Sequence, residues 1–191
     1  MINPTDTLHL RAAIALSARA RAAGNMPYGA LLVGSDGRVL AVAQNTQISE
    51  RDCTGHAETN LMRAATHKLD AASLADSTVY ASGEPCAMCV GAIYWGGVRR
   101  VVYALSIASM RELGGPDGDE LLLSCLEVWR AACARSTLPG RRCRKKPGAS
   151  FAPDRLPQNP GWRLGFAQAG GGFLRMSPAR LPRDRFHNQT T

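Results

Sequence analysis

The chain has 191 residues, of which 45% are hydrophobic and 20% are charged, a composition typical of a soluble globular protein long enough to bury a core. No stretch approaches the roughly 20 consecutive apolar residues that cross a bilayer, which excludes a transmembrane helix. The first residues lack the basic start and apolar stretch of a secretory signal. We therefore expect a cytoplasmic protein without a membrane partner.

The net charge of +8 is distributed unevenly along the chain. Residues 1–130 hold 11 Lys and Arg against 13 Asp and Glu, whereas residues 131–191 hold 12 against 2, so the two parts carry −2 and +10. The second part also contains seven of the 11 prolines and neither valine nor isoleucine. Such a segment cannot offset its ordering entropy by burial. The sequence predicts a folded domain over residues 1–134 and a basic, disordered tail over 135–191, although a basic tail can also bind phosphate backbones.

Helical and strand-like patterns alternate along residues 1–134. In chain order they predict a helix over 8–23, strands over 30–33 and 39–43, a helix over 57–67, a strand over 78–81, a helix over 87–94, a strand over 99–105 and a helix over 120–134. Ser35-Asp36-Gly37 is a hairpin signal between the first two strands. The alternation predicts an α/β fold, a three-layer sandwich with a central mixed sheet flanked by helices.

Two cysteines and one histidine form a candidate metal site. Cys86 and Cys89 stand three residues apart at a predicted helix start, so their sulfurs share one face, and the helix dipole there favours thiolates. With His56, thirty residues earlier, they make a ligand set that suits Zn²⁺. Three protein ligands leave a fourth position for water, as in catalytic zinc sites, and zinc lowers the pKa of that water.

Glu58 is the candidate proton carrier. It stands two residues after His56 and can reach the same cavity without serving as a ligand. A carboxylate beside a zinc-bound water can take its proton and return it to a leaving group. Hydroxide attack on an amidine-like ring carbon, followed by loss of ammonia, needs this proton transfer.

Other interpretations of the cysteines remain open. A redox pair fits poorly, because Pro85 precedes the first cysteine and no thioredoxin-like context surrounds it. A closed structural zinc site would need a third cysteine, and Cys53 is available three residues before His56. Six cysteines in a chain expected to be cytoplasmic argue against a disulfide framework.

The segments His56-Ala-Glu58 and Pro85-Cys-Ala-Met-Cys89 together resemble the zinc-dependent cytidine deaminase-like superfamily. Residues 8–130 are similar to the branch that contains guanine deaminases, fungal-type cytosine deaminases and bacterial tRNA adenosine deaminases. The resemblance implies a five-stranded sheet and a homodimer with active sites near the subunit interface. It gives His56, Cys86 and Cys89 the places of the zinc ligands and Glu58 that of the proton shuttle.

The resemblance also implies substrate contacts. Asn45, eleven residues before His56, matches an asparagine that hydrogen-bonds the base or sugar, although an asparagine after a strand is also a common turn residue. The backbone of Ala57 would hydrogen-bond the base. Tyr28 and Trp95 could stack on a planar base or wall its pocket, with packing in the core as the alternative.

Two departures from the family pattern limit how far the properties of the family can be expected of this chain. Guanine deaminases place an extra acidic residue shortly after the fourth strand, where this chain has Ser109. The chain has no Val or Ile after Val128, so the fifth strand is expected to be missing or replaced. The change in composition at 131–140 resembles out-of-frame translation of GC-rich DNA, with a lineage-specific tail as the alternative.

The sequence therefore favours a zinc-dependent hydrolase that removes ammonia from a small aminated nucleobase, guanine-like first. One alternative is a tRNA adenosine-to-inosine deaminase. The net charge of −2 over residues 1–130 argues against this alternative, because an RNA-binding surface is expected to be basic. A cytosine deaminase is another. Outside the enzymes, the chain could be a nucleic-acid-binding protein with a structural zinc and a basic tail, or an inactive product of a damaged gene.

Overall fold

The computed structural model describes residues 3–114 and 123–134, which belong to one compact unit. The predicted tail over 135–191 lies outside the described residues. Among the described helices, none combines the length and the apolarity needed to cross a bilayer.

The helices are α1 (Pro4–Ala22), α2 (Gln47–Glu50), α3 (Ala57–Thr66), α4 (Ala71–Ala75), α5 (Ala87–Trp95), α6 (Ile107–Gly114) and α7 (Cys125–Ala134). The strands are β1 (Gly29–Val33), β2 (Val39–Gln44), β3 (Thr78–Gly83) and β4 (Arg100–Leu105).

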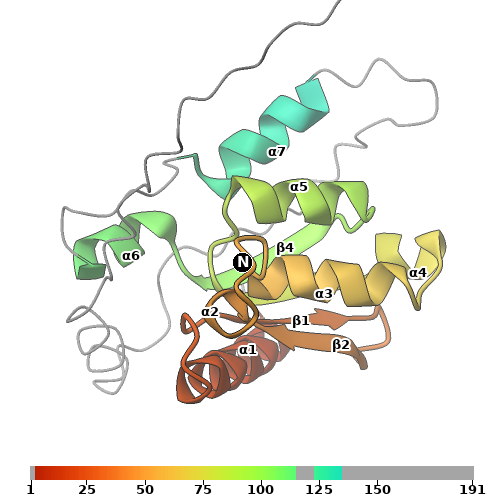
Figure 1. The fold of residues 1–191 in the computed structure, drawn as a ribbon. Coiled ribbons are helices and arrows are strands. Elements are labelled where there is room, and N and C mark those ends of the chain that lie inside the picture. Colours follow the sequence, from red (N-terminus) through yellow and green to blue (C-terminus); the bar gives the residue numbers. More distant parts are fainter. Residues whose placement is uncertain (1–2, 115–122, 135–191) are drawn as a thin grey trace, which may run out of the picture. The chain divides into compact units, whose positions relative to one another are not determined.

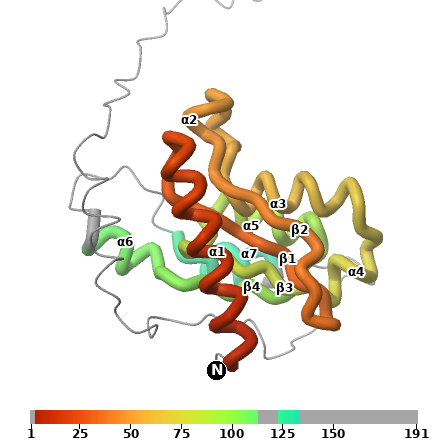
Figure 2. The backbone as a smooth tube through the Cα atoms, turned by 90° about the horizontal axis from the view of Figure 1, so that it is seen from below, coloured from red at the N-terminus to blue at the C-terminus, as the bar shows by residue number. Residues whose placement is uncertain are grey.

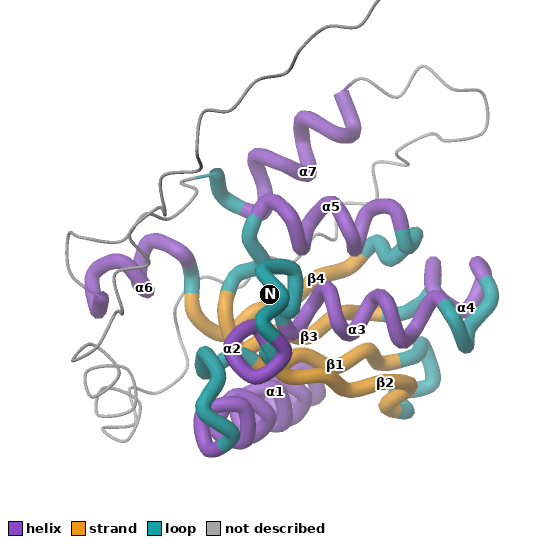
Figure 3. Tube along the Cα trace, viewed as in Figure 1, coloured by secondary structure: helices purple, strands orange, loops and turns teal. Residues whose placement is uncertain are grey.

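The strands form one mixed sheet in the order β2-β1-β3-β4 (Figure 3). β1 pairs antiparallel with both β2 and β3, whereas β3 and β4 are parallel. The predicted mixed sheet is thus confirmed. After β4, residues 107–114 and 125–134 form helices, and the part of the chain that the structure describes contains no fifth strand.

Helices cover both faces of the sheet, which confirms the three-layer fold. α1 lies across one face, and α3 and α5 lie side by side on the other (Figures 1 and 2). Alternate residues of β1 point to opposite faces, so Leu31 packs under α1 while Leu32 packs toward α3 and α5. α7 packs on α5, where the rings of Tyr94 and Trp129 meet edge to face at 6.0 Å.

Two helix starts differ from the predicted ones, and three helix ends differ by one residue. α1 begins at Pro4 rather than at residue 8, because Asn3 and Asp6 form a capping box that closes its first turn. α7 begins at Cys125 rather than at residue 120.

α1 lies unusually close to β1: a Cβ on Gly29 would come within 2.5 Å of the Ala13 carbonyl oxygen. Glycine at this position therefore permits the contact between helix and strand.

One edge of the sheet gathers several chain ends. The register pairs Gly29 with Gln44 and Gly83 with Leu105, so β1 begins where β2, β3 and β4 end. The segments that follow these three strand ends lead into α2 and α3, into α5 and into α6. This edge is where the predicted zinc ligands come together with Tyr28, Asn45 and Ala57, three of the four predicted substrate contacts.

Candidate active site

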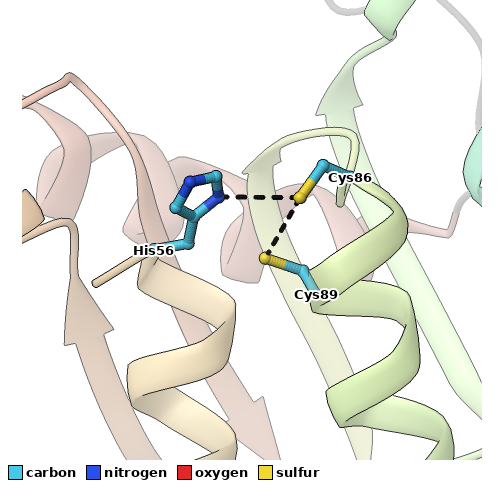
Figure 4. Close-up of side chains that lie close together, drawn as sticks. All are labelled: His56, Cys86 and Cys89. Atoms are coloured by element: carbon cyan, nitrogen blue, oxygen red, sulfur yellow. Dashed lines mark hydrogen bonds between the residues drawn. The ribbon is translucent and has the colours of Figure 1, made fainter. Parts of the chain in front are cut away.

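His56, Cys86 and Cys89 converge between α3 and α5 (Figure 4). His56 and Cys86 are the N-cap residues of α3 and α5, and Cys89 lies one turn into α5. Both N-cap residues have extended backbone, and neither side chain caps its own helix. Their side chains are therefore available to each other across the gap between the two helix starts.

The distances within this cluster fit a shared zinc ion. His56 Nδ1 lies 3.6 Å from Cys86 Sγ, and Cys86 Sγ lies 3.7 Å from Cys89 Sγ. The three ligand atoms all lie within 4.8 Å of one another. Tetrahedral zinc with Zn–S bonds of about 2.3 Å and Zn–N bonds of about 2.1 Å separates its ligand atoms by about 3.6–3.8 Å. Both the chemistry of the donors and their spacing thus suit zinc, which would be held by three protein ligands.

The electrostatics of the cluster favour a cation. Hydrogen bonds with Cys89 and His56 lower the pKa of the Cys86 thiol to about 4. The same contact with Cys86, together with burial and the nearby Glu58 carboxylate, raises the pKa of Cys89. The contact with Cys86 also raises the pKa of His56. One thiol ionises readily and the second is opposed by the first, so a divalent cation is the partner that would allow both to ionise.

Glu58 lies against the cluster but outside the ligand set. It occupies the first turn of α3 and is 4% exposed, and its Oε2 accepts a hydrogen bond from Cys89 Sγ at 3.4 Å. Burial raises the pKa of its carboxyl group. A buried carboxyl group beside a metal site, with its pKa raised, is suited to taking up and releasing a proton.

Two residues that the sequence analysis missed brace α3 against its surroundings. Thr59 Oγ1 lies 3.4 Å from Cys89 Sγ and so contacts the ligand cysteine from the neighbouring helix. Asn60 Nδ2 donates to Thr46 Oγ1 at 2.9 Å and lies within hydrogen-bond distance of the carbonyl oxygens of Gln44 and Gly55. These contacts fix the start of α3, although a Thr and an Asn in a helix carry no sequence signal of such a role.

Asn45 and Ala57 lie at the same edge of the sheet as the zinc ligands. Asn45 is fully buried, and its Oδ1 accepts the backbone N–H of Gln47 at 3.0 Å, an Asx turn. Its Nδ2 donates to Gln47 Oε1 at 2.8 Å. The turn interpretation of Asn45 is therefore confirmed, and one Nδ2 proton remains beyond this bond. Ala57 is the first residue of α3 and is also fully buried.

The two aromatic candidates lie in different places. Tyr28 precedes β1, its carbonyl oxygen accepts from Asn45 N at 3.0 Å, and its ring packs on the core beside the site edge. Trp95 is the last residue of α5, 74% exposed and six residues beyond Cys89, about 9 Å along the helix axis. The structure thus brings Tyr28 to the site edge and places Trp95 away from the zinc ligands of its own chain. Ser109 lies in the first turn of α6.

Cys53 is not part of the metal cluster. Its side chain is exposed, and among residues 3–114 and 123–134 the clustered metal-binding groups are His56, Cys86 and Cys89. The alternative of a closed site with Cys53 as a further ligand is therefore not supported.

A cavity of about 480 Å³ lies between β2 and α3. Thr46, Asn60 and His67 contribute to its lining, which includes none of the predicted ligands or substrate contacts. We therefore do not assign this cavity to the substrate.

A comparison with known protein families finds a match over residues 4–105. This segment matches the profile described as the cytidine and deoxycytidylate deaminase zinc-binding region. The match covers more than half of the chain and includes all three metal ligands and Glu58.

Individual relatives carry several substrate specificities. A probable cytosine deaminase of Schizosaccharomyces pombe is 36% identical over 118 residues, which cover 62% of this chain and 71% of that protein. A tRNA-specific adenosine deaminase of Haemophilus influenzae is 35% identical over 101 residues, 53% of this chain and 58% of that protein. A solved structure of guanine deaminase from Bacillus subtilis superposes with a TM-score of 0.54 at 38% identity, over 61% of this chain and 73% of that one.

Proposed function

Since this chain belongs to the cytidine and deoxycytidylate deaminase family, we propose that it is a hydrolytic deaminase of a small aminated nucleobase, with guanine-like bases first. The observation that carries this proposal is the juxtaposition of a three-ligand metal cluster with the buried Glu58 carboxyl group, 3.4 Å from Cys89 Sγ. A structural zinc site needs no such carboxyl group, whereas hydrolysis needs a group that moves protons.

The reaction replaces an amino group on a ring carbon by oxygen. When bound, zinc supplies a Lewis acid that lowers the pKa of water. Glu58 accepts a proton from the attacking water, and the C–O bond forms at the ring carbon. Glu58 delivers this proton to the ring nitrogen. It then transfers the proton of the newly formed hydroxyl to the amino group, the C–N bond breaks and ammonia leaves. Water and the aminated base are consumed, and the oxo base and ammonia are produced.

Asn45 and Ala57 would orient the base. Because Asn45 Oδ1 is occupied by the Gln47 N–H, Asn45 would offer its remaining Nδ2 proton, which suits an acceptor atom on the ring or an oxo group. The N–H of Ala57, in the first turn of α3, has no partner within its own helix and could donate to the base. Tyr28 would form an apolar wall at the same edge.

Two observations bear on the choice of substrate. The guanine deaminase structure supports a purine base, and the net charge of −2 over residues 1–130 argues against an extended RNA contact there. The tRNA-specific relative keeps a tRNA adenosine deaminase as the second candidate.

The test is ammonia release from zinc-loaded, full-length protein. Guanine, cytosine, adenine and an adenosine-bearing anticodon stem-loop are each offered as substrates. We expect deamination of a free base, guanine first, and a loss of about 10²–10⁴-fold in kcat for Glu58→Gln with one zinc per chain retained. Glu50→Gln, an exposed carboxylate on α2, serves as the matched control.

Each result decides between specific alternatives. Activity on the stem-loop alone would replace the base deaminase by the tRNA deaminase. Equal activity of wild type and Glu58→Gln would contradict the proposed proton carrier. Zinc binding without activity on any of the four substrates would favour a structural zinc.

A further inference from the structure

Glu84 is a buried carboxylate whose contacts the proposed reaction does not use. It follows β3, lies two residues before Cys86 and is 8% exposed. Its Oε2 accepts the backbone N–H of Ile107 at 2.9 Å, and its Oε1 accepts the backbone N–H of Cys125 at 2.8 Å. Ile107 and Cys125 are the first residues of α6 and α7. One side chain thus binds the starts of two helices, with one oxygen for each.

The backbone of Glu84 is fixed as well. Its N–H donates to the carbonyl oxygen of Leu105 at 2.7 Å, which continues the pairing of β3 with β4 by one residue. The carboxylate is therefore held on the sheet, and it is the helices that depend on it. First-turn N–H groups have no partner within their own helix, and a negative charge near them interacts favourably with the helix dipole.

α6 reaches the site edge through a contact with Tyr28. The hydroxyl of Tyr28 lies 3.6 Å from Met110 Sδ, and Met110 belongs to α6. Gly83 makes room for this contact, since a Cβ there would lie 3.1 Å from the Tyr28 ring and 3.3 Å from Met110 Sδ. The position of α6 therefore affects where the Tyr28 ring lies. This ring is close to Asn45, because the backbone N–H of Asn45 donates to the Tyr28 carbonyl oxygen.

α7 packs against α5, the helix that carries the cysteine ligands. Trp129 of α7 packs edge to face on Tyr94 of α5, and it also packs against the core cluster beneath α3 and α5. Glu84 therefore connects the turn before Cys86 with two helices that contact the surroundings of the site from different sides.

We propose that Glu84 is a positioning residue that anchors α6 and α7 to the zinc-ligand turn and thereby sets the wall of the substrate site at Tyr28 and Met110. The effect on the substrate rests on the proposed deaminase function, whereas the anchoring itself does not. A carboxylate is needed because both partners are donors. A glutamine has one carbonyl oxygen, and its NH₂ group would face an N–H, so one helix would lose its acceptor.

The anchoring is tested by hydrogen exchange on zinc-loaded, full-length protein. In Glu84→Gln we expect amide exchange in α6, α7 or both to be at least tenfold faster than in wild type, with exchange in α1 unchanged. Glu112→Gln, an exposed carboxylate of α6, is the matched control and should leave exchange unchanged. Unchanged exchange in α6 and α7 of Glu84→Gln would overturn the proposal, whatever the activity.

A second pair of variants tests one hydrogen bond without altering Glu84. Ile107 follows Ser106, whose Oγ accepts the N–H of Ser109, so Ile107 stands at the first helical position, where proline is well tolerated. Ile107→Pro deletes the N–H that binds Glu84, whereas Ile107→Ala shortens the side chain and keeps the N–H. Faster exchange in α6 for Ile107→Pro than for Ile107→Ala supports the anchor, and equal exchange in the two overturns it.

The kinetic readout separates positioning from stability alone. With whichever base wild type deaminates, we expect Glu84→Gln and Ile107→Pro to raise KM at least tenfold while kcat changes less than threefold, with one zinc per chain retained. Faster exchange with an unchanged KM would overturn the role in the substrate wall. If wild type deaminates none of the bases offered, the proposed function fails, and the exchange data still decide whether Glu84 anchors the helices.

Discussion

The two faces of the sheet bury charged groups in different ways. Under α1, the Asp6 carboxylate accepts two hydrogen bonds from Arg100 Nη2, at 2.9 and 3.0 Å, and a third from the Tyr80 hydroxyl at 2.7 Å. On the opposite face, two thiols cluster with one imidazole, and the Glu58 carboxyl group lies against one of the thiols. The first cluster contains its own positive partner, and the second is acidic except for a histidine.

This difference shows which buried polar cluster is structural. Asp6 and Arg100 balance each other in charge, and they connect the start of α1 to β4, 94 residues later in the chain. Such a pair needs nothing from outside the protein. The cluster at the helix starts becomes balanced when a cation joins it, so the chemistry of its donors indicates a ligand.

The largest effect should come from removing a zinc ligand. We expect Cys86→Ala to reduce the zinc content well below one per chain. Deaminase activity should fall by about 10⁴-fold or more, because the metal that acts as the Lewis acid is lost. Metal analysis after dialysis and a rate assay measure the two effects. Cys53→Ala, at an exposed cysteine outside the cluster, should retain zinc and activity. Full zinc content in Cys86→Ala would contradict the ligand assignment.

The ionic cluster under α1 should affect stability instead. We expect Asp6→Asn to lower the free energy of unfolding by about 3 kcal/mol, because it leaves the partly buried Arg100 without its charged partner. Urea unfolding of the zinc-loaded protein measures this loss. Zinc content and kcat should stay within twofold of wild type. A loss below about 1 kcal/mol would place this ion pair among surface salt bridges.

The stabilisation by Asp6 should also depend on pH. Burial opposes ionisation of Asp6, but hydrogen bonds from Tyr80, Asn3 and Arg100 outweigh it and lower its pKa below the ordinary value of 3.8. A carboxyl group with a lowered folded-state pKa contributes stability that is complete above the unfolded pKa and is lost as the pH falls through the folded pKa. The stability difference between wild type and Asp6→Asn should therefore be constant from pH 7 to 5 and shrink below pH 4. A difference that grows on acidification would contradict this sign.

The smallest effect should come from Trp95. Because its side chain is 74% exposed at the end of α5 far from the cysteine ligands, we expect Trp95→Ala to change kcat/KM of the dilute enzyme less than threefold. In a homodimer, as the family resemblance implies, Trp95 could lie at the interface, and sedimentation of the variant would then show weaker association. A tenfold loss of kcat/KM without a change in association would restore Trp95 as a substrate contact.

Each half of the zinc site could be predicted from the sequence because its spacing is local, and the family resemblance joined the two halves, which lie thirty residues apart. Cys86 and Cys89 are one helical turn apart, and His56 and Glu58 share the start of one helix, so spacing alone limited the geometry. The long strands and helices were predictable for the same reason. The short helices α2 and α4 offer too few residues for a periodic pattern.

Contacts across long sequence separations could not be predicted in this way. Glu84 and Cys125 are 41 residues apart, and nothing near either residue indicates that one binds the other. The exposure of Trp95 likewise depends on what α7 and α5 cover, rather than on the residues beside it. Tertiary packing decides such contacts, and no local pattern encodes them.

The shared edge at which β2, β3 and β4 end has a consequence for how new specificities could arise. The metal-binding side chains belong to the starts of α3 and α5, whereas the segments after β2 and β4 contain Asn45 and Met110. Insertions, deletions and substitutions in those two segments can reshape the surroundings of the metal site without moving an imidazole or a sulfur. One inherited metal centre could thereby serve rings of different size, which agrees with the range of bases named among the relatives of this chain.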